Sequence, residues 1–108
     1  MIDFTTEFGA RAAQSLQDEF VIWLVTVSPT LEPQPNPVWF LWEQDALLIY
    51  SQPDKPKLRN IAHHPAVALH LNCDRYGDHV VVLAGQARID ATAPAADQLP
   101  AYLAKYRE

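Results

Sequence analysis

The clearest candidate for chemistry is a cluster of cations just after an apolar run that ends in Tyr50-Ser51. Lys55, Lys57 and Arg59 fall within five residues of one another, in a chain with eight lysines and arginines. Phosphate recognition needs positive charge, hydroxyl donors and backbone N–H groups without partners, and a helix N-terminus supplies such N–H groups. Ser51 adds a hydroxyl donor. The cluster therefore predicts a phosphate site, and the alternative interpretation is a solvated basic face of a helix.

A second candidate is the aromatic run 37–42, which reads PVWFLW and is typical of a strand. Such a strand could place its backbone N–H and C=O groups beside the flat ring of a bound ligand, with aromatic side chains around that ring. The simpler interpretation is core packing, which we prefer for Phe40 and Trp42, and also for Trp23.

Other chemistries have weaker support. The lone Cys73 excludes an intramolecular disulfide framework and a cysteine-rich zinc site. The adjacent His63 and His64 would point about 100° apart on a helix, so they chelate one metal ion poorly. We interpret His70 and His79, which fall on different predicted strands, as structural histidines. The sequence therefore predicts no metal site, and no acid–base pair marks a catalytic residue.

Length and charge narrow the class of protein. The 108 residues fit a single domain spanning 1–108, and 49% hydrophobic against 19% charged residues argues against disorder. Thirteen acidic against eight basic residues give a net charge of −5, which argues against a nucleic-acid partner. No apolar run reaches the roughly 20 residues of a membrane span, and no signal peptide is apparent. We expect a cytoplasmic protein with no membrane partner.

The elements that must position these residues follow from periodicity and from turn residues. We expect helices over 5–19, 53–64 and 92–108, and strands over 20–27, 37–42, 46–51, 66–73 and 79–90. Phe8, Ala12 and Leu16 would form the buried stripe of the first helix. The strand 20–27 should be buried on both faces. Segment 28–36 is interpreted as a proline-spaced connection that cannot be a central strand.

Two further details concern the helix that carries the cations and the last strand. Pro56 is acceptable only in the first turn, which places Lys55 and Lys57 at the helix N-terminus. Gly85 within the last strand predicts a bulge or a close backbone approach. Long apolar strands joined by hairpins favour an antiparallel sheet curled into a small barrel, because a parallel fold would need crossover helices.

Several segments together resemble the pyridoxamine 5′-phosphate oxidase-like superfamily, and within it the branch of flavin- and deazaflavin (coenzyme F420)-dependent oxidoreductases. The matching segments, in chain order, are VIWL at 21–24, PNPVWF at 35–40, IYSQ at 49–52, KLRNI at 57–61, PAVAL at 65–69, GQA at 85–87 and YLAKYR at 102–107. The resemblance covers nearly the whole chain in register. One departure is the turn before PVWF, where Leu31-Glu32-Pro33 stands in place of the usual Asp-Gly.

The resemblance implies a fold that is mainly β with flanking helices: a split β-barrel of the antiparallel Greek-key type. It implies a homodimer that binds FMN or F420 at its interface. It also implies that Lys57 contacts the cofactor phosphate, with Ser51 beside it. The implied neighbours of Lys57 are Lys55, Arg59 and Asn60, and the strand carrying Pro37, Val38 and Trp39 would run along the ring system.

Three functions remain open at this point. The first is an FMN- or F420-dependent oxidoreductase that acts on a small organic substrate. The second is a non-catalytic protein that binds or carries a flavin, F420 or a tetrapyrrole. The third is a structural dimer whose basic cluster pairs with acidic residues of the neighbouring subunit.

Overall fold

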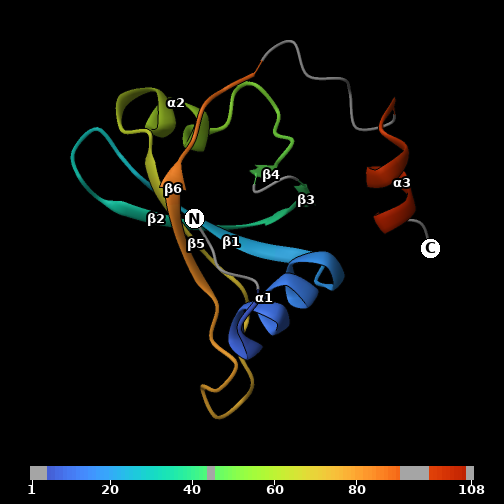
Figure 1. Ribbon diagram of the computed structural model, residues 1–108. Helices are drawn as coiled ribbons and strands as arrows, with labels where there is room; N and C mark the ends of the chain where they lie inside the picture. The colour runs from blue at the N-terminus through green and yellow to red at the C-terminus, as the bar shows by residue number, and fades with distance from the viewer. Residues whose placement is uncertain (1–4, 44–45, 91–97, 107–108) are drawn as a thin grey trace.

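The computed structural model describes residues 5–43, 46–90 and 98–106, and its strands form two antiparallel sheets (Figure 1). The elements are α1 (Glu7–Asp18), β1 (Val21–Val27), β2 (Pro33–Trp39), β3 (Leu41–Glu43), β4 (Ala46–Leu48), α2 (Pro56–His63), β5 (Ala66–His70), β6 (Val82–Gln86) and α3 (Pro100–Tyr106). The larger sheet has the order β2-β1-β5-β6, and β3 pairs with β4 in a separate hairpin. The predicted hairpin and the antiparallel arrangement are confirmed.

The core lies on one face of the larger sheet. Ile22 and Leu24 of β1 are buried there with Leu69 of β5, and Leu16 of α1 and Phe40 complete the centre. Burial along β1 alternates, as expected when one face of a strand packs on the core. The prediction that strand 20–27 is buried on both faces is therefore wrong, because its other face stays partly exposed.

The segment from Pro33 to Pro37 differs from the prediction. The sequence predicts a connection here, but the segment forms most of β2, which pairs with β1 from Val21↔Trp39 to Val27↔Pro33. Prolines are tolerated because β2 is the outer strand. The three prolines occupy alternate positions at which the backbone nitrogen faces away from β1, so no hydrogen bond between the two strands is lost. The expectation that this segment cannot be a central strand holds.

Helix α1 begins at a capped residue, since the Thr6 hydroxyl accepts a hydrogen bond from the Gly9 N–H at 2.9 Å. Ala12 and Leu16 are buried as predicted, whereas Phe8 is 59% exposed. Gly9, one residue further along, is buried in its place. The apolar stripe is therefore shorter than the one that periodicity predicts.

Several predicted strands differ in extent from the observed ones. The run 37–42 is divided between β2 and β3, and the strand 66–73 ends at His70. The strand 46–51 ends at Leu48, and the strand 79–90 is reduced to Val82–Gln86. Gly85 pairs with Val67 in an unbroken register, and no atom of the described residues lies within 4 Å of where its Cβ would stand, so neither a bulge nor a close backbone approach occurs there. Part of the helix expected over 92–108 lies outside the described residues, and its described part is α3.

The sheets, helices and hairpin confirm a β-rich fold with flanking helices. Within residues 5–43, 46–90 and 98–106 the strands do not close into a barrel, since β2 and β6 are the outer strands of an open sheet. None of the helices in these ranges is both long and apolar enough to cross a bilayer.

Candidate functional site

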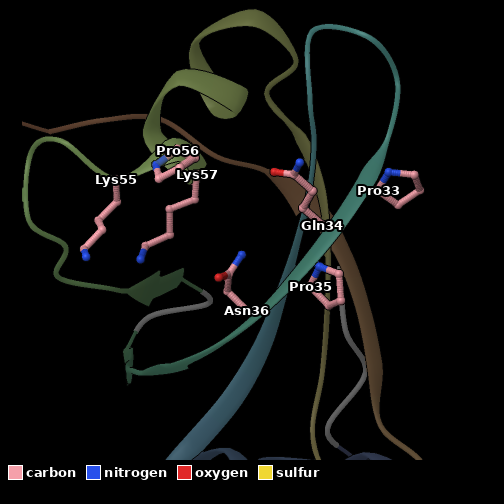
Figure 2. A pocket seen from close by; sticks show the side chains of 7 residues that line it. All are labelled: Pro33, Gln34, Pro35, Asn36, Lys55, Pro56 and Lys57. Atoms are coloured by element: carbon pink, nitrogen blue, oxygen red, sulfur yellow. The ribbon is translucent and has the colours of Figure 1, made fainter.

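A groove of 370 Å³ lies between β2 and the start of α2 (Figure 2). Its lining residues are Pro33, Gln34, Pro35 and Asn36 of β2, together with Lys55, Pro56 and Lys57. Four consecutive strand residues line it although successive side chains point to opposite faces of a sheet. The groove therefore follows the free edge of β2, and this volume lies within the range of small-molecule sites.

Two lysines enter the groove because of how α2 begins. Pro56 occupies the first turn, where its fixed φ suits a helix start, and Lys55 is the N-cap residue. Figure 2 shows both lysine side chains extending from this helix start into the space beside Asn36. The first turn holds no acidic residue, so the partial positive charge of the helix end adds to that of the lysines.

The two lysines differ in burial: Lys57 is half-buried and Lys55 is exposed. Within the described part of the chain, neither forms an ion pair with a carboxylate. Two members of the predicted cluster, Lys55 and Lys57, therefore line a groove, and neither has a carboxylate partner among the described residues. This is the arrangement that anion binding requires.

Asn60 supports the groove from behind. Its side chain is 1% exposed, and its Nδ2 donates to Thr26 Oγ1 at 2.9 Å and to Gln34 Oε1 at 2.8 Å. These two hydrogen bonds join α2 to β1 and to β2. The resemblance implied that Asn60 is a neighbour of the cofactor; the structure places it beneath the groove wall, where it fixes Gln34.

The other predicted site residues lie outside the groove lining. The Ser51 hydroxyl donates to the Gln52 carbonyl at 3.0 Å, and Arg59 is exposed on α2. Val38 and Trp39 continue β2 past the groove, but alternation turns them to opposite faces: Val38 packs on the core and Trp39 is 53% exposed. The side chains of Pro37 and Trp39 therefore lie on one face of the sheet, and that of Val38 lies on the other.

Sequence reasoning missed Gln34 and Asn36 because segment 28–36 was interpreted as a connection. A signal was present in the run PQPNP at 33–37, where prolines and amides alternate. A period of two is typical of a strand, and prolines at every second position are typical of an edge.

A second polar cluster joins α3 to the junction of β2 and β3. The Tyr106 hydroxyl accepts the Phe40 N–H at 2.8 Å and lies 2.8 Å from the Phe20 carbonyl, to which it donates. Lys105 Nζ donates to the Phe40 carbonyl at 2.8 Å and sits 3.5 Å from the centre of the Phe40 ring. The Tyr106 ring stacks on Trp39 with 4.3 Å between centroids.

Burial controls the titration of this second cluster. Desolvation lowers the pKa of Lys105 to about 8, and the charges of Asp18 and Glu19 offset part of that shift. Desolvation also raises the pKa of Tyr106, while its hydrogen bond to the backbone of Phe40 opposes the rise. Within the described ranges, no group of three or more His, Cys, Asp or Glu side chains is arranged to hold a metal ion.

The chain is similar to known proteins both in sequence family and in structure. The family model described as "Pyridoxamine 5′-phosphate oxidase" matches residues 8–108. Among solved structures, one described as an F420 reductase is similar, with 29% sequence identity and a TM-score of 0.61. The similarity covers 70% of this chain and 61% of that chain, so the match spans less than two thirds of the reductase. No curated protein matches the chain.

Proposed function

We propose that this chain, which belongs to the pyridoxamine 5′-phosphate oxidase family, is an oxidoreductase that uses FMN or F420 to act on a small organic substrate. The observation that carries the proposal is the position of Lys57: half-buried, at a helix N-terminus, and facing a groove without a carboxylate partner among the described residues. The similarity to an F420 reductase supports the choice of cofactor class.

The groove residues suit the phosphate end of such a cofactor. Lys57 would hold the phosphate as a point charge at the helix start, and the exposed Lys55 would add long-range attraction. Ser51 and Arg59 lie near this helix start in sequence and would act in an outer shell. When bound, the cofactor supplies hydride transfer, and the chain supplies its binding and orientation.

For the ring system we propose the continuation of β2 beyond the groove. Pro37 and Trp39 turn to the outer face of the sheet, where Trp39 offers one face of an indole already stacked on Tyr106. Val38 packs on the core, so its contribution would come from its backbone only.

The test of this proposal is the Lys57→Ala variant. Removing a charge-assisted phosphate contact costs about 1.5–3 kcal/mol, so we expect FMN or F420 to bind roughly ten- to a hundredfold more weakly in an absorbance titration. Arg75→Ala is the matched control, because Arg75 is an exposed cation over the ring of Tyr76, outside the groove lining, and its loss should leave affinity unchanged. Equal affinity of Lys57→Ala and the natural chain would contradict the assignment.

A carrier of the same cofactors is the second candidate function. Among the described lining residues there is no imidazole and no carboxylate to donate or accept a proton. A binding protein would take up FMN or F420 with the same dependence on Lys57 but would show no turnover with panels of reductants and acceptors. Steady turnover with any pair from those panels would establish the oxidoreductase.

We propose that the open sheet belongs to the split β-barrel that the sequence predicts. Trp42 and Leu47, from the hairpin β3–β4, pack against the same core as the large sheet. The hairpin thus lies over the inner face of that sheet, which is the first step in closing a barrel.

We also propose a homodimer formed through the outer face of the large sheet. The register places the following side chains on that face: Val21, Trp23, Val25 and Val27; Pro33, Pro35, Pro37 and Trp39; Ala66, Ala68 and His70; Val82, Ala84 and Gln86. None of these is Lys, Arg, Asp or Glu, and all remain partly or fully exposed. An apolar sheet face of this kind is typical of an interface.

The dimer is tested with Val82→Asp, which places a carboxylate on that face. Val82 is 64% exposed, so the isolated protomer should tolerate the change. A dimer must bury the carboxylate without a partner, and we expect its dissociation constant to rise at least about a hundredfold in sedimentation. Leu31→Asp is the control, since Leu31 is 69% exposed but lies in the β1–β2 turn. A natural chain that is monomeric at micromolar concentration would refute the dimer.

A further inference from the structure

A row of four aromatic rings runs from the outer strand β2, across α3, to the segment that follows β4. The Trp39 ring lies parallel to the Tyr106 ring, with 4.3 Å between their centroids. The centroids of Tyr106 and Tyr102 are 4.9 Å apart, and those of Tyr102 and Tyr50 are 5.2 Å apart. These separations place each ring in direct contact with the next. Rings from three separate parts of the sequence thus form one continuous row.

The residue types in this row go beyond what packing requires. Phenylalanine fills such a position equally well, as Phe40 does in the core of this chain. An indole or a phenol loses one electron far more readily than a phenylalanine ring does. Phe20, whose ring centroid lies 5.2 Å from that of Tyr106, therefore does not extend the row as an electron donor. Trp39 is 53% exposed, so an oxidant in solution reaches the row at this end.

The charges around the row favour electron loss at the end opposite Trp39. The Lys105 ammonium group lies 5.4 Å from the centre of the Tyr106 ring, so it disfavours a positive charge on that ring. Desolvation raises the pKa of Tyr50, and the negative charge of Glu43 raises it further. The same negative charge favours a positive charge on the Tyr50 ring. An electron deficit on the row is therefore drawn away from Tyr106 and toward Tyr50.

The hydrogen bonds of the phenols favour the same end. The Tyr106 hydroxyl lies 2.8 Å from the Phe20 carbonyl and 2.9 Å from the Phe40 carbonyl. A carbonyl oxygen is too weak a base to take the phenolic proton, so oxidised Tyr106 does not become a stable neutral radical. Tyr50 is half-buried and within electrostatic range of the exposed Glu43, so its proton can pass to water or to that carboxylate.

We propose that the four rings form a relay that carries a one-electron oxidation from Trp39 to Tyr50. A one-electron oxidant, such as an oxygen-centred radical, takes an electron from the Trp39 indole and is itself reduced. One electron then moves along each ring contact toward Trp39, which restores the first three rings, and the indole regains any proton that it released to water. Tyr50 gives up one electron and its phenolic proton. No cofactor takes part, so the proposal does not depend on the proposed function.

Pulse radiolysis with the azide radical, which oxidises indole in preference to phenol, tests the relay on the whole chain without a cofactor. The starting protein carries Trp23→Phe and Trp42→Phe, so an indole radical forms only at Trp39. It also carries Cys73→Ser, because an exposed thiol competes for the oxidation. We expect the tryptophanyl absorption to decay and the tyrosyl absorption to grow at one common rate that is independent of protein concentration. A tyrosyl signal that is absent, or whose rate rises with protein concentration, would overturn the relay.

Tyr106→Phe interrupts the relay in this starting protein, because it keeps the ring beside Trp39 but removes the oxidisable phenol. We expect the transfer rate to fall at least about tenfold, which corresponds to a barrier higher by about 1.4 kcal/mol. Tyr76→Phe is the matched control, since Tyr76 is 78% exposed in the β5–β6 turn and lies outside the row. Its transfer rate should equal that of the starting protein. An unchanged rate in Tyr106→Phe would contradict the proposal.

The position of the final radical gives a second test that leaves the hydrogen bonds of Tyr106 in place. A nitroso spin trap forms adducts with tyrosyl radicals, and peptide mass spectrometry compares the adduct yields at Tyr50 and Tyr76. With Trp39 present, we expect more adduct at Tyr50 than at Tyr76. In Trp39→Phe the order should reverse, because direct oxidation follows exposure and Tyr76 is the more exposed of the two. The same ratio of the two adducts in both proteins would overturn the relay.

Discussion

Two half-buried lysines, at opposite ends of β2, show what turns a cation into a candidate binding group. Lys57 stands at the start of α2 and faces the groove, with no carboxylate partner among the described residues. Lys105 stands on α3, and its ammonium group is held by the Phe40 carbonyl at 2.8 Å and by the Phe40 ring at 3.5 Å. Two lysines of similar burial thus differ in whether the ammonium group is available to a ligand.

The difference lies in what supports each lysine. The backbone at the groove end is held from below by a buried amide, Asn60, so the lysine head groups remain available. At the other end the lysine is itself the support, since it fastens α3 to the backbone of Phe40. Burial alone therefore does not mark a ligand site; the engagement of the donors does.

The largest effect is expected from breaking the support of the groove. Asn60→Ala removes two hydrogen bonds and leaves Thr26 and Gln34 each short of a donor, of which Thr26 is fully buried. We expect a loss of about 2–4 kcal/mol in the free energy of unfolding, measured by denaturant titration. The neighbouring Arg59→Ala, on the exposed side of α2, should stay within about 0.5 kcal/mol. A similar loss of unfolding free energy in both variants would show that the buried Asn60 contributes no more to stability than the exposed Arg59.

An intermediate effect is expected from breaking the other end. Tyr106→Phe deletes the hydroxyl that satisfies Phe40 and Phe20, but the ring stack on Trp39 remains. Partial exposure lets water replace some of the lost contacts, so the expected cost is about 1–2 kcal/mol. Tyr76→Phe, at a tyrosine that is 78% exposed, should change nothing measurable. Cofactor affinity unchanged in Tyr106→Phe would confine the Tyr106 hydroxyl to a structural role, as far as the cofactor is concerned.

The smallest effect concerns pH. The pKa of Lys105 is about 8 in the folded chain, against 10.5 for an ordinary lysine. The unfolded chain therefore binds more protons between these values, and stability should rise as pH increases through that window. The raised pKa of Tyr106 acts in the opposite direction only near and above pH 10. Measurements from about pH 7 to about pH 9.5 thus isolate the lysine.

Lys105→Met is the control for the pH experiment. The variant lacks the titrating group but keeps an unbranched apolar stem, so the rise in stability over that pH range should disappear or shrink. An identical rise in the variant would assign the pH dependence to another group. If stability does not change with pH in either protein, the Lys105 ammonium group stays hydrated. The contrast between Lys105 and Lys57 would then be weaker than their contacts suggest.

Several parts of this fold follow from local sequence. Pro56 predicted that Lys55 and Lys57 lie at the start of a helix, as they do in α2, although that helix begins at Pro56 and not at 53. Turn residues between apolar runs predicted strands joined by hairpins, and β3 and β4 form one. These succeed because a proline or a turn residue acts within a few residues of itself, and such effects do not depend on the rest of the fold.

Other parts depend on partners far along the chain. Pro33–Pro37 can form a strand because β1 pairs with it on one side only, and a local sequence pattern does not predict this pairing. The role of Asn60 depends on Thr26, 34 residues away, and the place of Trp39 depends on Tyr106. Polar side chains and aromatic rings in these positions have several possible partners, and only the folded arrangement selects one.

The parallel stack of Trp39 on Tyr106 has a practical consequence. The chain has three tryptophans, and replacing Trp23 and Trp42 by phenylalanine would leave one indole whose neighbouring ring belongs to α3. Its fluorescence would then report, in real time, whether the last helix is attached. A rapid change in emission after a pH or denaturant jump, ahead of global unfolding, would reveal that helix leaving first.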